Sequence, residues 1–184
     1  MAGAIKFNYD KSKLDRIVKF FDSKKEVKIG VLSNEWKQAP DKKWERKIGP
    51  VELAMVHEFG STIRRIPQRS FLRKTMVLRS GDFKSEIEAN RSAIMDNIAN
   101  GQGYQFLAKV GATWRAYVLE AWNRSGPGWA PLSQRTIDMR RSVWTGKYLA
   151  DNGKKRRREY AKSTKILWVT GALARSISFE VTKG

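Results

Sequence analysis

The sequence predicts an α+β fold, a single domain in which several amphipathic helices pack on a small antiparallel sheet. Long segments carry apolar residues every three or four positions, whereas 26–32 and 176–182 alternate between apolar and polar residues. These segments do not follow one another as repeated βαβ units, which argues against a parallel α/β sheet. At 184 residues the chain has room for one substantial core. We therefore expect one domain over 1–184.

The N-terminal part predicts a helix followed by a strand. Apolar residues recur at helical spacing over 14–21, and Asp10 or Ser12 can cap that helix. Residues 26–32 then alternate as a half-buried strand does. A long polar loop is expected over 33–49, where tryptophans are isolated among charged residues.

A short helix and a turn are expected next. Pro50 suits the first position of a helix, and Gly60 suits its end because glycine tolerates positive φ. Pro67 favours an extended conformation in the residue before it. Ser70 can cap a new helix that begins at Phe71.

Two longer amphipathic helices are expected over 82–98 and 104–123, with a turn at 100–103 between them. The second helix has an apolar stripe at steps of three and four, which is typical of a face that packs in a core. That stripe consists of Tyr104, Leu107, Gly111, Trp114, Val118 and Trp122.

The C-terminal third predicts shorter elements. After the breaker NRSGPG, Ser133 can cap a helix, and Thr170 can cap a single helical turn. The strict alternation of 176–182 then predicts a strand. Between these elements, 142–165 is expected to form a basic loop or extension.

The charge of the chain is its most unusual bulk property. Lys and Arg number 37 against 18 acidic residues, a net charge of +19. Such an excess is typical of proteins that contact nucleic acid, an acidic protein or an anionic surface. The residues expected to make that contact are Arg64, Arg65, Lys154, Lys155, Arg156, Arg157 and Arg158. A well-solvated basic surface with no specific partner is the simpler alternative.

The segment VHEFGSTIRRIPQRSFLR (56–73) contains the only histidine, His57, beside Glu58. Adjacent residues of a helix point about 100° apart, and a helical metal site needs a second ligand three or four positions away. Those positions carry Leu53, Ala54, Gly60 and Ser61, none of which is a typical ligand. We therefore expect His57 and Glu58 to hold a corner of the fold together, through backbone hydrogen bonds, rather than to catalyse a reaction.

Other signals for catalysis or binding of a cofactor are weak. The chain has no cysteine, which excludes disulfides and thiolate chemistry. Gly101 and Gly103 form a GxG pair without the preceding strand or the third glycine of a phosphate loop. No apolar run reaches membrane-spanning length. We expect no enzyme activity, no cofactor, no metal and no membrane contact.

Three ordered segments resemble the tail-completion, or virion morphogenesis, proteins of tailed bacteriophages, a group that overlaps the neck and head–tail joining proteins. They are LAMVHEFGSTIRRIPQRSFLR after the strand VKIGVL, then GWAPLSQRTIDMRR, and finally ILWVTGALARSISFEV. The resemblance spans roughly 26–181. Its motif residues include His57, Glu58, Phe59, Gly60, Pro67, Arg69, Phe71, Trp129, Leu132, Thr136, Thr170, Gly171, Leu173 and Ser176.

The resemblance implies a structural virion protein that is assembled in the host cytoplasm and lies at the head–tail junction. It implies a homo-oligomeric ring in contact with other neck, connector and tail proteins, with genomic DNA in the lumen as a further candidate partner. It also implies that the last segment forms a hairpin. Two alternatives stay open: a stand-alone basic DNA-binding protein, and a hydrolase that uses His57 and Glu58.

Overall fold

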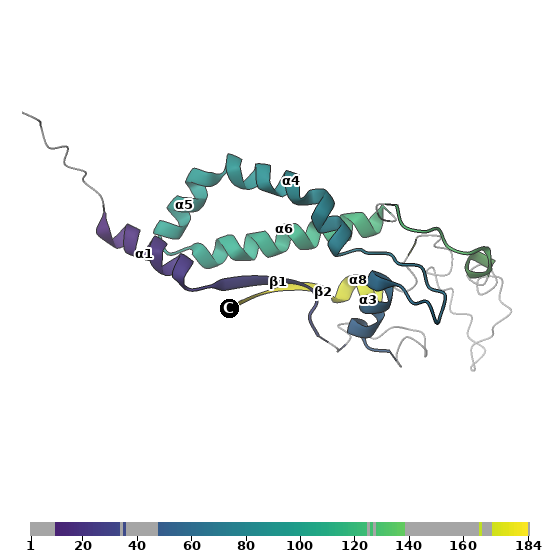
Figure 1. The fold of residues 1–184 in the computed structure, drawn as a ribbon. Coiled ribbons are helices and arrows are strands. Elements are labelled where there is room, and N and C mark those ends of the chain that lie inside the picture. The colour runs from purple at the N-terminus through teal and green to yellow at the C-terminus, as the bar shows by residue number, and fades with distance from the viewer. Residues whose placement is uncertain are drawn as a thin grey trace, which may run out of the picture.

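A computed structural model describes residues 10–33, 35, 48–124, 126, 128–138, 166 and 171–183, and it shows the expected α+β class (Figure 1). In chain order the elements are α1 (Lys11–Asp22), β1 (Lys25–Val31), α3 (Pro50–Phe59), α4 (Arg73–Ala89), α5 (Arg91–Ala99), α6 (Gly103–Asn123), α8 (Ala172–Ser176) and β2 (Ile177–Lys183). Helix α6 lies between the α4–α5 arm and the sheet (Figure 1).

The sheet pairs β1 with β2 in antiparallel orientation, so the strand that follows α1 lies beside the C-terminal strand. Ile29 is opposite Phe179, and Val31 is opposite Ile177. Helix α6 packs on this pair at Gly111, where a Cβ atom would overlap the Phe179 ring. Glycine at that position lets the helix approach the sheet closely.

The pairing of β2 corrects one implication of the resemblance. A hairpin was expected within the last segment, but within the described residues β2 pairs with β1, more than a hundred positions earlier, and helix α8 directly precedes β2. Residues 167–170 lie outside the described part of the chain. The reason is the apolar face that β1 presents through Val27, Ile29 and Val31, which matches the alternation of β2 in register.

The predicted caps at the two N-terminal helices are confirmed. The Asp10 side chain accepts hydrogen bonds from the backbone N–H groups of Ser12 (3.0 Å) and Lys13 (3.4 Å) at the start of α1. Pro50 occupies the first turn of α3, and Gly60 follows its last residue with φ of 77°.

The single helix predicted over 82–98 is wrong. Helix α4 begins earlier, at Arg73, and a break at Asn90 separates it from α5. The Asn90 side-chain amide donates to the Glu86 carbonyl (2.8 Å), which also accepts a hydrogen bond from the Asn90 backbone N–H (3.2 Å). The Asn90 backbone leaves helical geometry, with φ of −106° and ψ of 12°, and the chain changes direction there (Figure 1).

The helix predicted over 104–123 is confirmed, but its predicted apolar stripe is buried only in part. Gly111, Val118 and Trp122 are buried, but Tyr104 is 58% exposed at the N-terminal end of α6. Tyr104 lines a hollow beside α1.

The structure describes only some of the residues for which C-terminal elements were predicted. Residues 134–138 are helical, and the Ser133 hydroxyl accepts from the Thr136 N–H (3.3 Å), as a cap does. The helical turn after position 170 is present as α8, with Gly171 at its N-cap. Thr170, the basic segment 142–165 and most of the 33–49 loop lie outside the described residues.

The core lies where the three motif segments meet. Trp122 of α6 is fully buried at its centre, in edge contact with the rings of Phe71 (centroids 4.7 Å apart) and Trp129 (6.2 Å). Such aromatic pairs add to the stabilisation from burial itself. The buried cluster comprises Ala54, Phe71, Val118, Trp122, Trp129, Leu173, Ala174 and Ile177.

Candidate interaction site

The Glu58 carboxylate caps the start of α4 from the end of α3. Oxygen Oε2 accepts hydrogen bonds from the backbone N–H groups of Phe71 (2.8 Å) and Leu72 (3.0 Å). Oxygen Oε1 accepts from the Arg73 N–H (3.1 Å), the Arg73 Nε–H (3.1 Å) and the Ser70 hydroxyl (2.5 Å). A negative charge at a helix N-terminus is also favoured by the helix dipole.

This arrangement corrects the predicted cap. Ser70 was expected to cap a helix that begins at Phe71, but α4 begins at Arg73 and its N-terminal N–H groups turn toward Glu58. A carboxylate has acceptor sites on two oxygens and can take several donors at once, whereas a hydroxyl takes one or two. The Ser70 hydroxyl instead donates to Glu58 and accepts only a long bond from Lys74 N–H (3.3 Å).

The Glu58 carboxyl is held in its charged form. Burial would raise its pKa, but the hydrogen bonds from Leu72, Ser70 and Arg73 outweigh burial, and the pKa lies below its ordinary value. All its acceptor capacity is directed at the start of α4. Glu58 is therefore unsuited to exchange protons with a substrate near neutral pH.

His57 is a packed neutral residue. Burial, followed by the nearby charge of Arg69, lowers the pKa of His57 to about 4. Its buried Nδ1 has no hydrogen-bond partner among the described residues. The backbone carbonyl of His57 accepts from the Arg69 N–H (2.7 Å), and the Glu58 carbonyl accepts from the Gln68 side chain (3.1 Å). These bonds join the end of α3 to the segment that leads into α4.

Between them the chain forms a tight loop. Ser61 and Ile66 exchange two backbone hydrogen bonds of 2.8 Å, which close a tip of residues 62–65. Gly60 is required at its base, because a Cβ there would lie 2.9 Å from the Gln68 nitrogen. We call residues 62–65 the tip loop.

The tip loop presents an apolar residue beside two cations. Ile63 is 95% exposed, and Arg64 and Arg65 beside it are exposed as well. A hollow of about 550 Å³ lies at the base of the loop, lined by the residues from Phe59 to Gln68 other than Arg64. Phe59 is itself 58% exposed, and the Arg73 guanidinium lies 4.5 Å from its ring centroid. An exposed isoleucine and aromatic ring flanked by arginines are typical of protein contact surfaces.

Two buried side chains connect this corner to the second motif. The Arg69 guanidinium, in a residue that is 7% exposed, donates to the carbonyls of Ala130 (3.2 Å) and Pro131 (3.3 Å). In return the Trp129 indole N–H donates to the Ser70 carbonyl (3.2 Å). The corner is therefore fixed on both sides, by α3 and by the 129–131 segment.

The structure brings most of the motif residues together and leaves others outside this corner. Phe71, Trp129 and Leu173 share the core cluster, and the buried Ser176 hydroxyl donates to the Ala172 carbonyl (3.0 Å). Leu132 and Thr136 are partly buried, and Pro67 is exposed. The predicted basic cluster lies outside the described residues. It comprises Lys154, Lys155, Arg156, Arg157 and Arg158.

Sequence reasoning missed the exposure of Ile63. A signal existed, because an isoleucine between Gly60 and Pro67 sits in a turn too short to bury it. It also missed Arg73, whose contacts with Glu58 and Phe59 depend on where α4 begins.

Within the described ranges, no group of three or more His, Asp or Glu side chains is placed to hold a metal ion. None of the described helices is long and apolar enough to cross a membrane. Comparison of the chain with protein-family models, with curated proteins and with solved structures finds no match.

Proposed function

We propose that this chain is a structural virion protein of a tailed bacteriophage, which forms a ring at the neck or at the head-proximal end of the tail and acts in tail completion and head–tail joining. The observation that carries the proposal is the convergence of the three motif segments on one core around Trp122. Segments far apart in sequence that meet in this way act as one structural unit, and the tip loop is an exposed part of it.

The chemistry of the corner supports a structural role over hydrolysis. The Glu58 carboxylate takes five hydrogen bonds from the 70–73 segment, and His57 is neutral and largely buried. A general base needs a free lone pair within reach of a substrate. In this corner the acid instead stabilises the fold, and the exposed chemistry belongs to Ile63, Arg64 and Arg65.

The tip loop supplies a contact for the neighbouring copy or for the next ring. Its two closing hydrogen bonds and the fixed corner beneath it hold the loop in one conformation, which lowers the entropic cost of binding. In a ring, the net charge of +19 per copy adds up to a strong field. That field favours contact with DNA in the lumen or with acidic surfaces of neighbouring proteins.

Deletion of the gene, followed by electron microscopy of the particles, tests the proposal. Filled heads beside unattached tails are expected. Complementation with Ile63→Asp should restore the protein but not joining, because the substitution alters an exposed contact and no core residue. Thr62→Ser, in the same loop, is the matched control and should restore infectious particles. Normal virions in the deletion strain would contradict the proposal.

The alternative, a stand-alone basic DNA-binding protein, is favoured by the net charge alone. It predicts normal virion assembly without the chain, together with DNA affinity that falls steeply with salt. The deletion experiment separates the two functions.

A further inference from the structure

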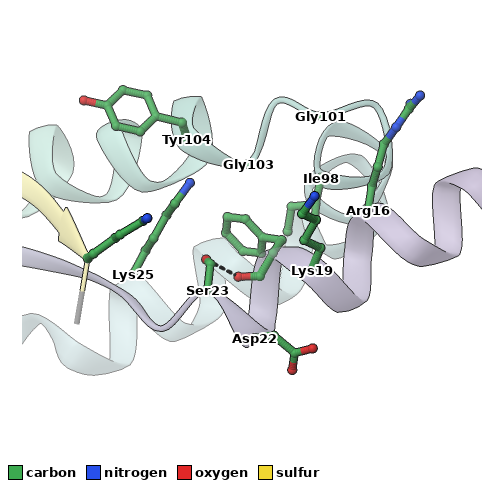
Figure 2. Close-up of a pocket in the computed structure, with 11 residues that line it drawn as sticks. Arg16, Lys19, Asp22, Ser23, Lys25, Ile98, Gly101, Gly103 and Tyr104 are labelled. Atoms are coloured by element: carbon green, nitrogen blue, oxygen red, sulfur yellow. Dashed lines mark hydrogen bonds between the residues drawn. The ribbon is translucent and has the colours of Figure 1, made fainter.

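A second surface lies at the α1 end of the molecule, away from the 56–73 corner (Figure 1). Here α1, the start of α6 and the outer end of the sheet surround a hollow of about 670 Å³, drawn in Figure 2. The basic residues that line it are Arg16, Lys19, Lys25 and Lys183, and the only acidic one is Asp22. We call this surface the cationic hollow.

Segments from both ends of the described chain build the cationic hollow. Arg16 and Lys19 lie on α1, while Lys25 opens β1 and Lys183 ends β2. Lys25 and Lys183 are direct partners in the antiparallel register. Like charges placed opposite each other destabilise a strand pair, so an anion between them would relieve a repulsion that the fold itself creates.

The four cations are available to a ligand. Among the described residues, none of them forms an ion pair with a carboxylate. Figure 2 shows Arg16, Lys19 and Lys25 extending toward the side of the α5–α6 turn, whereas the Asp22 carboxylate points the opposite way. One Arg16 nitrogen donates to the Ala99 carbonyl (3.2 Å), which fixes the guanidinium and leaves its other N–H groups unused by that bond.

The start of α6 adds to the positive potential. Helix α6 is 21 residues long, and its first turn has neither an acidic residue nor a side-chain cap. A Cβ on Gly103 would overlap the Phe20 ring, so α1 and its cations lie directly against this helix end. The half-exposed Tyr104 stands at the rim (Figure 2).

We propose that the cationic hollow binds the phosphodiester backbone of duplex DNA. Lysine acts as a point charge for phosphate, and three lysines with one arginine around the hollow can neutralise successive phosphates without reading a base. The inference rests on the proposed function only in the choice of duplex DNA as partner. It assigns the contact to this end of the molecule rather than to the tip loop.

The test measures the affinity of the purified full chain for a fluorescently labelled duplex at several salt concentrations. The double variant Lys25→Gln/Lys183→Gln removes the cross-strand pair. Lys84→Gln/Lys109→Gln removes the same charge from exposed lysines that do not line the hollow. For the first variant, loss of two phosphate contacts should lower the magnitude of the slope by about 2 when the logarithm of the binding constant is plotted against the logarithm of the salt concentration. The slope of the control should stay near that of the parent.

Equal slopes in the two double variants would overturn the proposal. So would equal competition by polyglutamate of matched charge or by vesicles with anionic lipid, since these would assign the hollow to an acidic protein or a membrane surface. Circular dichroism spectra of both variants, compared with that of the parent, serve as the control for folding. The proposed virion role is tested by the deletion strain, so either proposal can fail while the other holds.

Discussion

The Glu58 carboxylate accepts a 2.8 Å hydrogen bond from the backbone N–H of Phe71, thirteen positions later in the chain. The Phe71 ring is fully buried against Trp122. Phe71 thus donates its backbone N–H to the capping carboxylate and places its side chain in the core. The position of α4, and with it the base of the tip loop, depends on this pair.

Replacing Glu58 by glutamine should destabilise the fold. Both carboxylate oxygens of Glu58 accept hydrogen bonds from backbone N–H groups of the 71–73 segment. Glutamine keeps the size of the side chain, but its NH₂ group replaces one of these acceptors and faces N–H donors. We expect a loss of about 2–3 kcal/mol in the free energy of unfolding, measured by denaturant titration. Glu52→Gln, at an exposed acid of the same helix, is the control and should change stability little. Equal effects of the two substitutions would refute the cap.

The stability of the protein should depend on His57 between pH 5 and 7. Burial lowers the pKa of His57 from 6.5 to about 4, so in this range the unfolded chain binds a proton that the folded chain does not. The free energy of unfolding is therefore highest above pH 6.5, and it falls as the pH drops from 6.5 toward 4. We expect a loss of about 2 kcal/mol between pH 7 and pH 5, measured by denaturant titration.

Because His57 is the only histidine, the variant His57→Gln isolates its contribution. Its free energy of unfolding should be nearly constant over the same range, even if it is lower throughout. A variant that keeps the full pH dependence would show that another group is responsible. The Glu58 carboxyl adds a separate loss below its ordinary pKa, since its folded pKa is lowered.

Two helical glycines should respond to alanine in opposite directions. A methyl group at Gly111 would overlap Phe179, so Gly111→Ala should cost about 1–3 kcal/mol through displacement of α6 from the sheet. Gly81 in α4 has nothing within 4 Å of an added Cβ, and Gly81→Ala should gain about 0.5–1 kcal/mol from helix propensity. Thermal unfolding of both variants checks the pair. A stabilising Gly111→Ala would contradict the α6–sheet packing.

Arginine at position 69 should not be replaceable by lysine. The guanidinium reaches the Ala130 and Pro131 carbonyls with two separate nitrogens, which one ammonium group cannot do in the same geometry. We expect Arg69→Lys to cost about 1–2 kcal/mol in the free energy of unfolding. Arg91→Lys, at an exposed position of α5, should have no measurable effect. A silent Arg69→Lys would show that the corner does not depend on the 129–131 segment.

Local signals predicted much of the fold. The Asp10 cap, the helix from Pro50 to Gly60 and the β1 and β2 alternations each depend on residues close together in sequence. Those features follow from capping, proline geometry and side-chain periodicity, all of which are visible in a short window.

Two features that were not predicted, the cap of α4 and the sheet partner of β2, depend on contacts distant in sequence. The cap of α4 comes from Glu58 on another helix, whereas the local sequence around 70–73 indicates only Ser70 as a cap. The pairing of Lys25 with Lys183 exists only because the two ends of the chain share a sheet. The break at Asn90 had a local signal, but the apolar period on both sides of it continues and hides it.

The most direct test of the account is a density map of the assembled virion by electron cryomicroscopy, since the proposed location is the head–tail junction. We expect a ring of copies of this chain there, with the tip loop in contact with a neighbouring subunit. A well-resolved junction without this chain would contradict the account.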